Sequence, residues 1–349
     1  MKKLRLFEGI GNELEYMIVD KTTLKVLPLT EDLIYHETKD YGAEVDHGAI
    51  SWSNELVAHV IELKTNGPAA SIEGLNELFH KEVQYINEKL AIKNAMLLPT
   101  ASQPFFVPEK ETIIWPHEYN EIYELYDRIF NCKGHGWSNL QSMHINFPFA
   151  DDSEFEVLHA AIRMILPILP ALAASSPIIE GEVTGKIDTR LHYYQQNQKL
   201  IPIIAGLVIP EAVFSKAEYH ERIFDPIAKA IAPYDIEGVL DKHFLNSRGA
   251  IARFDRGAIE IRILDLQECP KADLAIAALV TESIKWLIKS YKSDQLELLK
   301  DACAIHSLWS ILQQTIEHGS KAGIDHVMYL EIMQAEEAKT AKRYLESFF

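Results

Sequence analysis

A ten-residue stretch near the start of the chain, GNELEYMIVD at residues 11–20, places two glutamates inside a β-strand pattern. Successive side chains of a strand point to opposite faces of the sheet, so Glu13 and Glu15 share one face. The other face is apolar and consists of Leu14, Tyr16 and Ile18. At about 7 Å apart and an effective dielectric constant of about 20, the two carboxylates repel by roughly 2.5 kcal/mol. The strand therefore needs a packed apolar layer on one side and water or a bound cation on the other.

Two later segments show the same asymmetry between their faces. In QSMHINF the polar face consists of Ser142, His144 and Asn146, and in GAIEIRILD it consists of Glu260 and Arg262. The opposite face of each segment is apolar. Further strands are indicated within ELVAHVIELKT and AMLLPTAS. We therefore expect a sheet half covered by helices, and its bare face, lined by Glu, His, Asn and Arg, is the candidate site.

The segments between these strands have the spacing of amphipathic helices. We expect Ser71 and Ser153 to cap two of them. Ser215 and Glu218 form a capping box before a third helix. Pro226 is expected to split that third helix. The helices are predicted at residues 71–96, 118–130, 153–174 and 215–231, and over most of the chain after residue 271. No repeat or linker marks a boundary, so we expect residues 1–349 to form a single catalytic domain of α+β class with a mostly helical C-terminal flank from about residue 271.

The balance of charge excludes several kinds of partner. The chain of 349 residues carries 34 basic and 51 acidic residues, a net charge of −17. Nucleic acids and anionic membranes need a basic surface, so we expect neither, and a nucleotide would need divalent metal to offset the charge. The three cysteines are far apart, which indicates free thiols and a cytoplasmic location. MKKLRLFEGIGNE lacks an apolar run of about 7 to 15 residues, so we expect no secretory signal, and MILPILPALAA is predicted to be too short to span a bilayer.

Carboxylates together with one imidazole favour a hard cation such as Mg²⁺, with Mn²⁺ as the alternative. The candidate ligands are Glu13, Glu15, Glu55, Glu62, His144 and Glu260. These are more than one magnesium ion takes from protein, so two or more metals are expected. Seven residues separate Glu55 from Glu62, so Glu55 needs a bend or a place before the strand.

Each of these residues also has an ordinary structural interpretation. A Glu-x-Arg pair on a strand is more often an ion pair, and His144 between two apolar residues is more often a structural histidine. The functional interpretation depends on the coincidence of three strands with matching faces. Other motifs are weaker: GIGNEL lacks the third glycine of a dinucleotide site, GEVTGK lacks the spacing of a P-loop, and Cys132 near His135 indicates a turn more than a thiol nucleophile.

Four blocks of this sequence resemble the second glutamate–cysteine ligase family. GNELEYMIVD, ELVAHVIELKT, LQSMHINFPF and RGAIEIRILDLQECP occur in the order and at the distances typical of that family, over roughly residues 8–270. The resemblance implies a glutamine-synthetase-like domain, in which a curved, mainly antiparallel sheet forms a funnel and helices pack on its outer face. It implies that the six candidate ligands bind metal and that Asn146 and Arg262 contact the nucleotide. It also implies two catalytic arginines. Arg262 would meet the transferred phosphate, and Arg190 would lie near the substrate.

The implied reaction is ATP- and Mg²⁺-dependent formation of an amide bond. The γ-phosphoryl group of ATP passes to a substrate carboxylate, and an amine attacks the resulting acyl phosphate. The implied partners are small carboxylate and amine molecules, amino acids among them, and a second copy of the chain in a homodimer. QSMHINFPF departs from the His-x-His form common in relatives, and the cysteine-binding residues have no counterpart here. The alternatives are a metal-dependent phosphohydrolase and a non-catalytic relative that binds a nucleotide or an amino acid.

Overall fold

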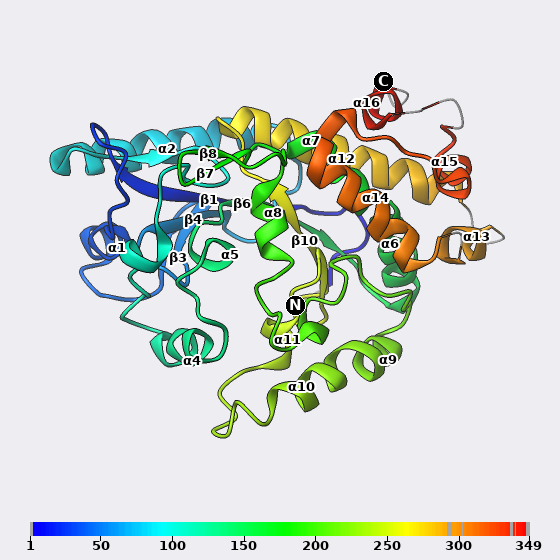
Figure 1. Cartoon of the computed structure of the whole chain (residues 1–349), viewed down its shortest axis with the longest axis horizontal. Coiled ribbons are helices and arrows are strands. Elements are labelled where there is room, and N and C mark those ends of the chain that lie inside the picture. The colour runs from blue at the N-terminus through cyan, green and yellow to red at the C-terminus, as the bar shows by residue number, and fades with distance from the viewer. Residues whose placement is uncertain (1–2, 292–294, 302, 336–337, 339, 347–349) are drawn as a thin grey trace.

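An antiparallel sheet of eight strands forms the centre of the computed structural model, which describes residues 3–291, 295–301, 303–335, 338 and 340–346. Seven strands follow the order β2-β3-β4-β1-β6-β10-β9, and β5 pairs with β1 beside β6 (Figure 1). The strands are β1 (Gly11–Asp20), β2 (Glu44–His47), β3 (Ile50–Asn54), β4 (Val60–Thr65), β5 (Ala95–Leu98), β6 (Ser142–Pro148), β9 (Ala250–Arg253) and β10 (Ala258–Asp265). This sheet with its helices confirms the predicted α+β class.

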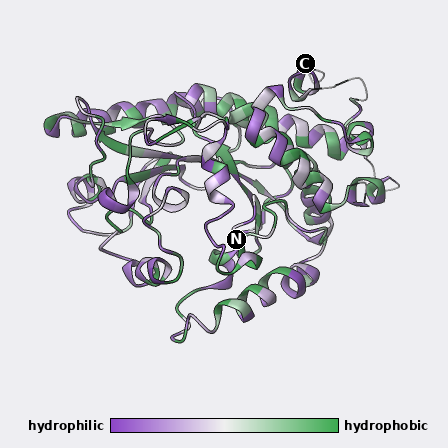
Figure 2. Cartoon of the chain, viewed as in Figure 1, coloured by the Kyte–Doolittle hydropathy of each residue, from purple (hydrophilic) through white to green (hydrophobic). Residues whose placement is uncertain are grey.

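The apolar face of the sheet is buried as predicted. Leu14, Tyr16 and Ile18 of β1 join one large hydrophobic core with the apolar residues of β6 and β10. Helices α2 (Leu75–Leu90), α6 (Asp152–Ile165) and α12 (Pro270–Ser290) contribute to the same core, and α12 contacts both of the others. Figure 2 shows hydrophobic residues gathered on the central strands. Helices therefore cover the face opposite Glu13 and Glu15.

The second half of β1 is closed on both faces. Met17 and Val19, which share a face with the two glutamates, pack with Leu98 and Phe106 in a smaller hydrophobic cluster. The polar face is therefore confined to the first half of β1, where β4 and β6 flank it. Two helices border this polar region: α4 (Asn120–Phe130), whose Tyr123 hydroxyl accepts a hydrogen bond from Asn54, and α8 (Thr189–Tyr194), whose Tyr194 contacts Arg262.

Shorter elements complete the described fold. The remaining α-helices are α1 (Thr30–Thr38), α3 (Pro108–Glu111), α5 (His135–Ser138), α7 (Leu169–Ala173), α9 (Lys216–Tyr219), α10 (Asp225–Ile231), α11 (Lys242–Leu245), α13 (Leu296–Asp301), α14 (Ile305–His318), α15 (Val327–Ile332) and α16 (Ala341–Glu346). Strands β7 (Ile178–Ile179) and β8 (Glu182–Val183) form a separate hairpin. Short 3₁₀ turns cover Ala91–Lys93, Leu166–Ile168, Pro202–Ile204 and Gly319–Lys321, and a π-helical turn covers His220–Phe224.

Several predicted helix boundaries were wrong. The helix predicted from residue 71 begins at Leu75, after Gly74 in a left-handed conformation, and Ser71 does not cap it. Its predicted end belongs to β5, because Asn94 turns the chain back toward β1. The cap of α6 is Asp151 rather than Ser153, since the Asp151 carboxylate accepts the first free N–H groups. Ser215 caps α9 as expected.

The C-terminal flank is helical but more divided than predicted. After α12, the flank that was predicted to be mostly helical consists of the shorter helices α13, α14, α15 and α16. Residues 292–294, 302, 336, 337, 339 and 347–349 of this flank lie outside the described residues. Where Pro226 was expected to split a helix, a π-helical turn comes directly before α10. Strands β2, β3 and β9 were not predicted, because segments of four or five residues are too short to show a clear periodicity.

The apolar stretch MILPILPALAA, which was predicted to be too short to span a bilayer, lies almost entirely within a helical segment that matches the helix predicted at residues 153–174. Helices α6 and α7 and the turn between them run from Asp152 to Ala173, which is long and apolar enough to cross a membrane by length and composition alone. Within its apolar window, 78% of the residues are buried inside the protein. The segment therefore packs as a core helix, and α6 contributes to the large hydrophobic core.

Candidate active site

The pairing of the strands brings the predicted ligands together on one face of the sheet. Glu13 of β1 is opposite His144 of β6, and Glu15 of β1 is opposite Glu62 of β4. Glu260 of β10 is opposite Asn146 of β6. Directly paired residues point to the same face, so four neighbouring strands place their polar side chains in one cluster. The sequence predicted this cluster from the faces of three of these strands.

Two groups of donor atoms share His144 at the centre of the cluster. One group consists of Glu13, His144 and Glu260, and the other of Glu15, Glu62 and His144. Within each group, one donor atom from each residue lies within 4.8 Å of the others. Nδ1 of His144 is 2.9 Å from Oε2 of Glu13, and Nε2 is 3.7 Å from Oε1 of Glu15. Five of the six predicted ligands are thus close enough to share cations.

Gly11 makes room for a side chain that holds Glu13. The Nδ2 atom of Asn146 donates a hydrogen bond of 2.9 Å to Oε1 of Glu13. Asn146 is opposite Gly11 in the sheet, and a Cβ atom at Gly11 would come within 3.1 Å of the Asn146 Cβ. The glycine that opens the GNELE motif therefore serves close packing against Asn146.

Two serines orient the remaining carboxylates. The backbone N–H of Ser142 donates to Oε2 of Glu15 at 2.6 Å, and its hydroxyl lies 2.8 Å from the same oxygen. That hydroxyl is also 2.9 Å from Nε2 of His144. On the other side, the Ser53 hydroxyl donates to Oε2 of Glu62 at 2.7 Å. The outer partners thus fix the ligand side chains, as they do at metal sites generally.

Glu55 lies beside the cluster but outside both donor groups. It follows β3 and precedes β4, which is the place before the strand that its spacing required. Burial first, and then the charges of Glu15 and Glu13, raise the pKa of Glu55 to about 8. Glu55 is therefore near the two glutamates of β1, although its carboxylate does not join the donor atoms in the structure.

Three cationic side chains flank the acidic cluster. Arg262 forms hydrogen bonds from Nε and Nη2 to Oε1 of Glu260, at 3.1 and 2.5 Å. Nη1 of Arg253 is 3.9 Å from Oε2 of Glu260, and Nζ of Lys64 is 3.6 Å from Oε2 of Glu62. Arg253 and Lys64 were missed at the sequence level, although each lies on a strand face shared with a site residue. A substrate with several negative charges would meet these cations beside the carboxylates.

Arg190 is buried and its guanidinium is occupied by the protein. It forms an ion pair with the buried Asp265, and its Nη2 donates to the carbonyl oxygen of Ile263 at 2.7 Å. Its side chain is only 1% exposed. Arg190 was predicted to act near the substrate, but its guanidinium is buried in the structure. There it holds β10, the strand that carries Arg262.

The charges within the cluster depend strongly on one another. Burial alone would raise the pKa of Glu13, but the hydrogen bond and charge of His144 lower it to about 2. Burial would lower the pKa of His144, but its bond to Glu13 and the charge of Glu15 raise it to about 9. Burial and the charge of Glu13 hold the pKa of Glu62 well above its usual range. The buried acids thus outnumber the cations that neutralise them.

This donor set fits a hard divalent cation. Carboxylate oxygens and one imidazole nitrogen are ligands that Mg²⁺ and Mn²⁺ accept, and none of the three cysteines belongs to either donor group. A cation would relieve the repulsion among the carboxylates.

The Cys132 thiol is buried, and burial raises its pKa far above the usual range, which does not favour a thiol nucleophile.

The antiparallel sheet presents clustered carboxylates, an imidazole and arginines on one face, and its fold has a counterpart among solved structures. A solved structure, that of a bifunctional glutathione synthetase from Pasteurella multocida, matches it with a TM-score of 0.53 at 12% identity. The match covers 98% of this chain and 47% of that chain, and it shows a shared fold.

The chain belongs to glutamate-cysteine ligase family 2, whose sequence model matches residues 9–342. This family membership confirms the resemblance seen in the four sequence blocks. Together with the fold, it supports a ligase that joins a carboxylate and an amine.

Individual relatives show how far the similarity extends. An uncharacterized protein of Archaeoglobus fulgidus is 32% identical over 348 residues, 96% of this chain and 92% of its own length. A putative glutamate–cysteine ligase 2 of Ruegeria pomeroyi is 26% identical over 60% of this chain and 50% of its own length. A putative glutamate–cysteine ligase 2 of Cupriavidus metallidurans is 30% identical over 52% of this chain and 46% of its own length. The chain thus matches about half the length of these two ligases.

Proposed function

We propose that this protein is an ATP- and Mg²⁺-dependent carboxylate–amine ligase that forms an amide bond through an acyl phosphate. The observation that carries the proposal is the convergence of two donor groups on His144, directly beside Arg262. Such a site suits the transfer of a phosphoryl group to a carboxylate, because carboxylates hold cations and an arginine meets the transferred charge.

In this proposal each residue of the cluster has a part. Glu13, Glu15, Glu62, His144 and Glu260 hold two or more divalent cations, with Glu55 as a further carboxylate at the edge. When bound, Mg²⁺ would neutralise the triphosphate and polarise the phosphoryl group that is transferred, and Mn²⁺ is the alternative ion.

The arginines and Asn146 act on the substrates. Glu260 holds the guanidinium of Arg262 by two hydrogen bonds, which orients its remaining N–H groups for a phosphate. Arg253, 7% exposed on the neighbouring strand, adds a second positive charge. Asn146 orients Glu13 and so acts at the nucleotide site through it. Arg190 of helix α8 supports Arg262 by binding Asp265 and Ile263 of the same strand, β10.

Family and fold support the class of reaction, and the substrates are part of the proposal. Two curated relatives carry the name putative glutamate–cysteine ligase 2, and glutamate and cysteine are therefore the first pair to test. We propose that residues 1–349 act as a single catalytic domain on small molecules in the cytoplasm, and that a homodimer is the assembly.

The test is an ADP-release assay over pairs of acids and amines. We expect release that requires Mg²⁺, a carboxylate and an amine together. Glu15→Gln and Arg262→Ala should each reduce it by about 100-fold or more, whereas Arg256→Ala, on a side chain 61% exposed, should not. Full turnover in both site variants would remove the cluster from the mechanism. Phosphate release from simple phosphoesters without an amine would favour a phosphohydrolase instead.

A further inference from the structure

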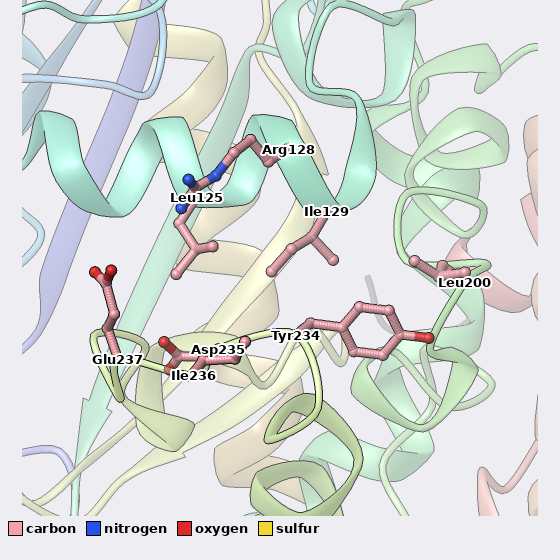
Figure 3. Close-up of a pocket in the computed structure, with 8 residues that line it drawn as sticks. All are labelled: Leu125, Arg128, Ile129, Leu200, Tyr234, Asp235, Ile236 and Glu237. Carbon is pink, nitrogen blue, oxygen red and sulfur yellow. The ribbon is translucent and has the colours of Figure 1, made fainter.

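A cavity of about 420 Å³ lies between α4 and the loop that follows α10 (Figure 3). Leu125 and Ile129 of α4 point into it from one side, and Tyr234 and Ile236 lie on the other side. None of the predicted ligands lines it. Its volume falls within the range of small-molecule sites, roughly 300–1,000 Å³. The cavity is therefore a second feature of the molecule that needs a ligand or a partner.

The walls of the cavity are apolar and partly open to solvent. Ile236 is 90% exposed and Tyr234 is 43% exposed, although both are large hydrophobic residues. Leu200, at the end of the cavity, is 51% exposed. Leu125 on the opposite wall is buried. Exposed apolar residues gathered around one hollow indicate a surface that binds an apolar group.

The loop wall is held in place before any ligand binds. The carboxylate of Asp235 accepts hydrogen bonds from the backbone N–H groups of Val239 and Leu240, at 2.9 and 2.8 Å. Asp235 is itself buried, at 8% exposure. The opposite wall is a regular helix. A preformed site loses less conformational entropy on binding.

Two charged side chains of opposite sign face each other across the cavity. Arg128 projects from α4, and Glu237 projects from the loop (Figure 3). Among the described residues neither forms an ion pair. The pair fits a ligand with one negative and one positive group and an apolar body between the walls.

Helix α4, one wall of the cavity, also approaches the candidate active site. Tyr126, next to Leu125 on α4, is close enough to Arg262 for the charge of the arginine to act on it. Tyr194 of α8, which precedes Leu200 in the chain, also contacts Arg262. Helix α4 therefore borders both the cavity and the surroundings of Arg262.

We propose that this cavity binds the amine substrate, and that this substrate is an amino acid with a bulky apolar or aromatic side chain. Arg128 binds its carboxylate, the walls from Leu125 and Ile236 hold its side chain, and Glu237 attracts the ammonium form in which it arrives. The inference rests on the proposed ligase function, since it names one of the two substrates. An adenine ring would also fit apolar walls, but it carries no charge for Arg128 and Glu237.

Calorimetric titration of the full chain with L-phenylalanine and with L-alanine tests the proposal without any turnover. We expect L-phenylalanine to bind on the order of tenfold more tightly or better, because only its ring reaches the apolar walls. Ile129→Trp should fill the cavity and weaken L-phenylalanine by a similar factor. Ile92→Trp, at an exposed residue of the 3₁₀ turn Ala91–Lys93, is the matched control.

Arg128→Gln provides a second variant at an exposed position where folding is not at risk, with Arg343→Gln on α16 as its control. We expect only Arg128→Gln to weaken L-phenylalanine. Equal affinity for the two amino acids overturns the proposal, and so does unchanged affinity for L-phenylalanine in both cavity variants. The proposal is also overturned if adenosine competes with L-phenylalanine and Ile129→Trp abolishes that competition. If instead no pair of substrates releases ADP while these binding results hold, the ligase function fails and the amino-acid site stands.

Discussion

At the scale of single residues, Ser142 connects the two donor groups of the candidate site. Its hydroxyl lies within 2.9 Å of both Glu15 and His144, and its backbone N–H also binds Glu15. It reaches no other carboxylate of the cluster. Ser142 is therefore an orienting residue whose removal should loosen the ligands while the strand pairing stays intact.

We expect Ser142→Ala to weaken Mn²⁺ binding by about 10-fold or more, as is typical for groups that orient metal ligands. The measurement is calorimetric titration with Mn²⁺. Ser71→Ala, before α2 and away from the cluster, is the control. Unchanged Mn²⁺ affinity in Ser142→Ala, with a native melting temperature, would contradict an orienting role.

His159 of α6 is a residue whose charge affects stability rather than the site. It is fully buried, and it stacks on Phe155 at a centroid distance of 5.2 Å. Burial, and then the charge of Arg163, lower the pKa of His159 to about 3. The unfolded chain takes up this proton below about pH 6.5, whereas the native protein does not. Stability from this group is therefore lost progressively as the pH falls from about 6.5 toward 3.

His159→Phe should consequently reduce the fall in melting temperature between about pH 7.5 and about pH 5. A phenyl ring keeps the stacking and cannot take up a proton. Thermal denaturation at the two values measures the effect, with the exposed His80→Phe on α2 as the control. The same pH dependence in His159→Phe and wild type would show that this histidine does not carry the effect.

At the scale of elements, the buried pair of Arg190 and Asp265 fixes an irregularity in β10. The register between β10 and β6 shifts between Ile261 and Leu264, where Arg262 lies. Arg190 of α8 binds both Asp265 and the carbonyl oxygen of Ile263 within this stretch. The ion pair thus joins a helix to the bulged strand that aims Arg262.

Breaking this pair should be costly, because it leaves an uncompensated buried charge. We expect Arg190→Met to lower the free energy of unfolding by roughly 3–5 kcal/mol, and Arg190→Met with Asp265→Leu to recover part of the loss. Urea denaturation of both variants gives the two values. A double variant no more stable than the single one would argue against a direct charge pair.

The elements also show what the sequence could and could not predict. The alternation of GNELEYMIVD predicted β1 with its observed bounds, and the polar faces of β6 and β10 predicted the cluster, because local periodicity sets which side chains share a face. Arg253 was missed because β9 is a short buried strand without a visible pattern. The ion pair of Arg190 with Asp265 was not predicted, because the two residues are distant in sequence. The wrong start of α2 reflects the left-handed Gly74, which local propensity does not show.

At the scale of the whole molecule, a net charge of −17 opposes folding through repulsion, and several of the buried acids lie in one cluster. Specific cation binding to that cluster should stabilise the native state more than general screening does. We therefore expect MgCl₂ to raise the melting temperature by a few degrees more than NaCl at equal ionic strength. Differential scanning fluorimetry measures this, and Glu15→Gln should reduce the difference. Equal melting temperatures in both salts would mean that the cations stabilise the protein only by general screening of its charge.

The central claim is that the acidic cluster binds divalent cations that carry ATP, and electron paramagnetic resonance of Mn²⁺ tests it most directly. The titration is made with the full chain and an ATP analogue that cannot transfer its γ-phosphoryl group. We predict two or more bound Mn²⁺ per chain, with fewer or weaker sites in Glu15→Gln and Glu260→Gln. Absence of saturable Mn²⁺ binding in the folded protein, or binding unchanged in both variants, would contradict it.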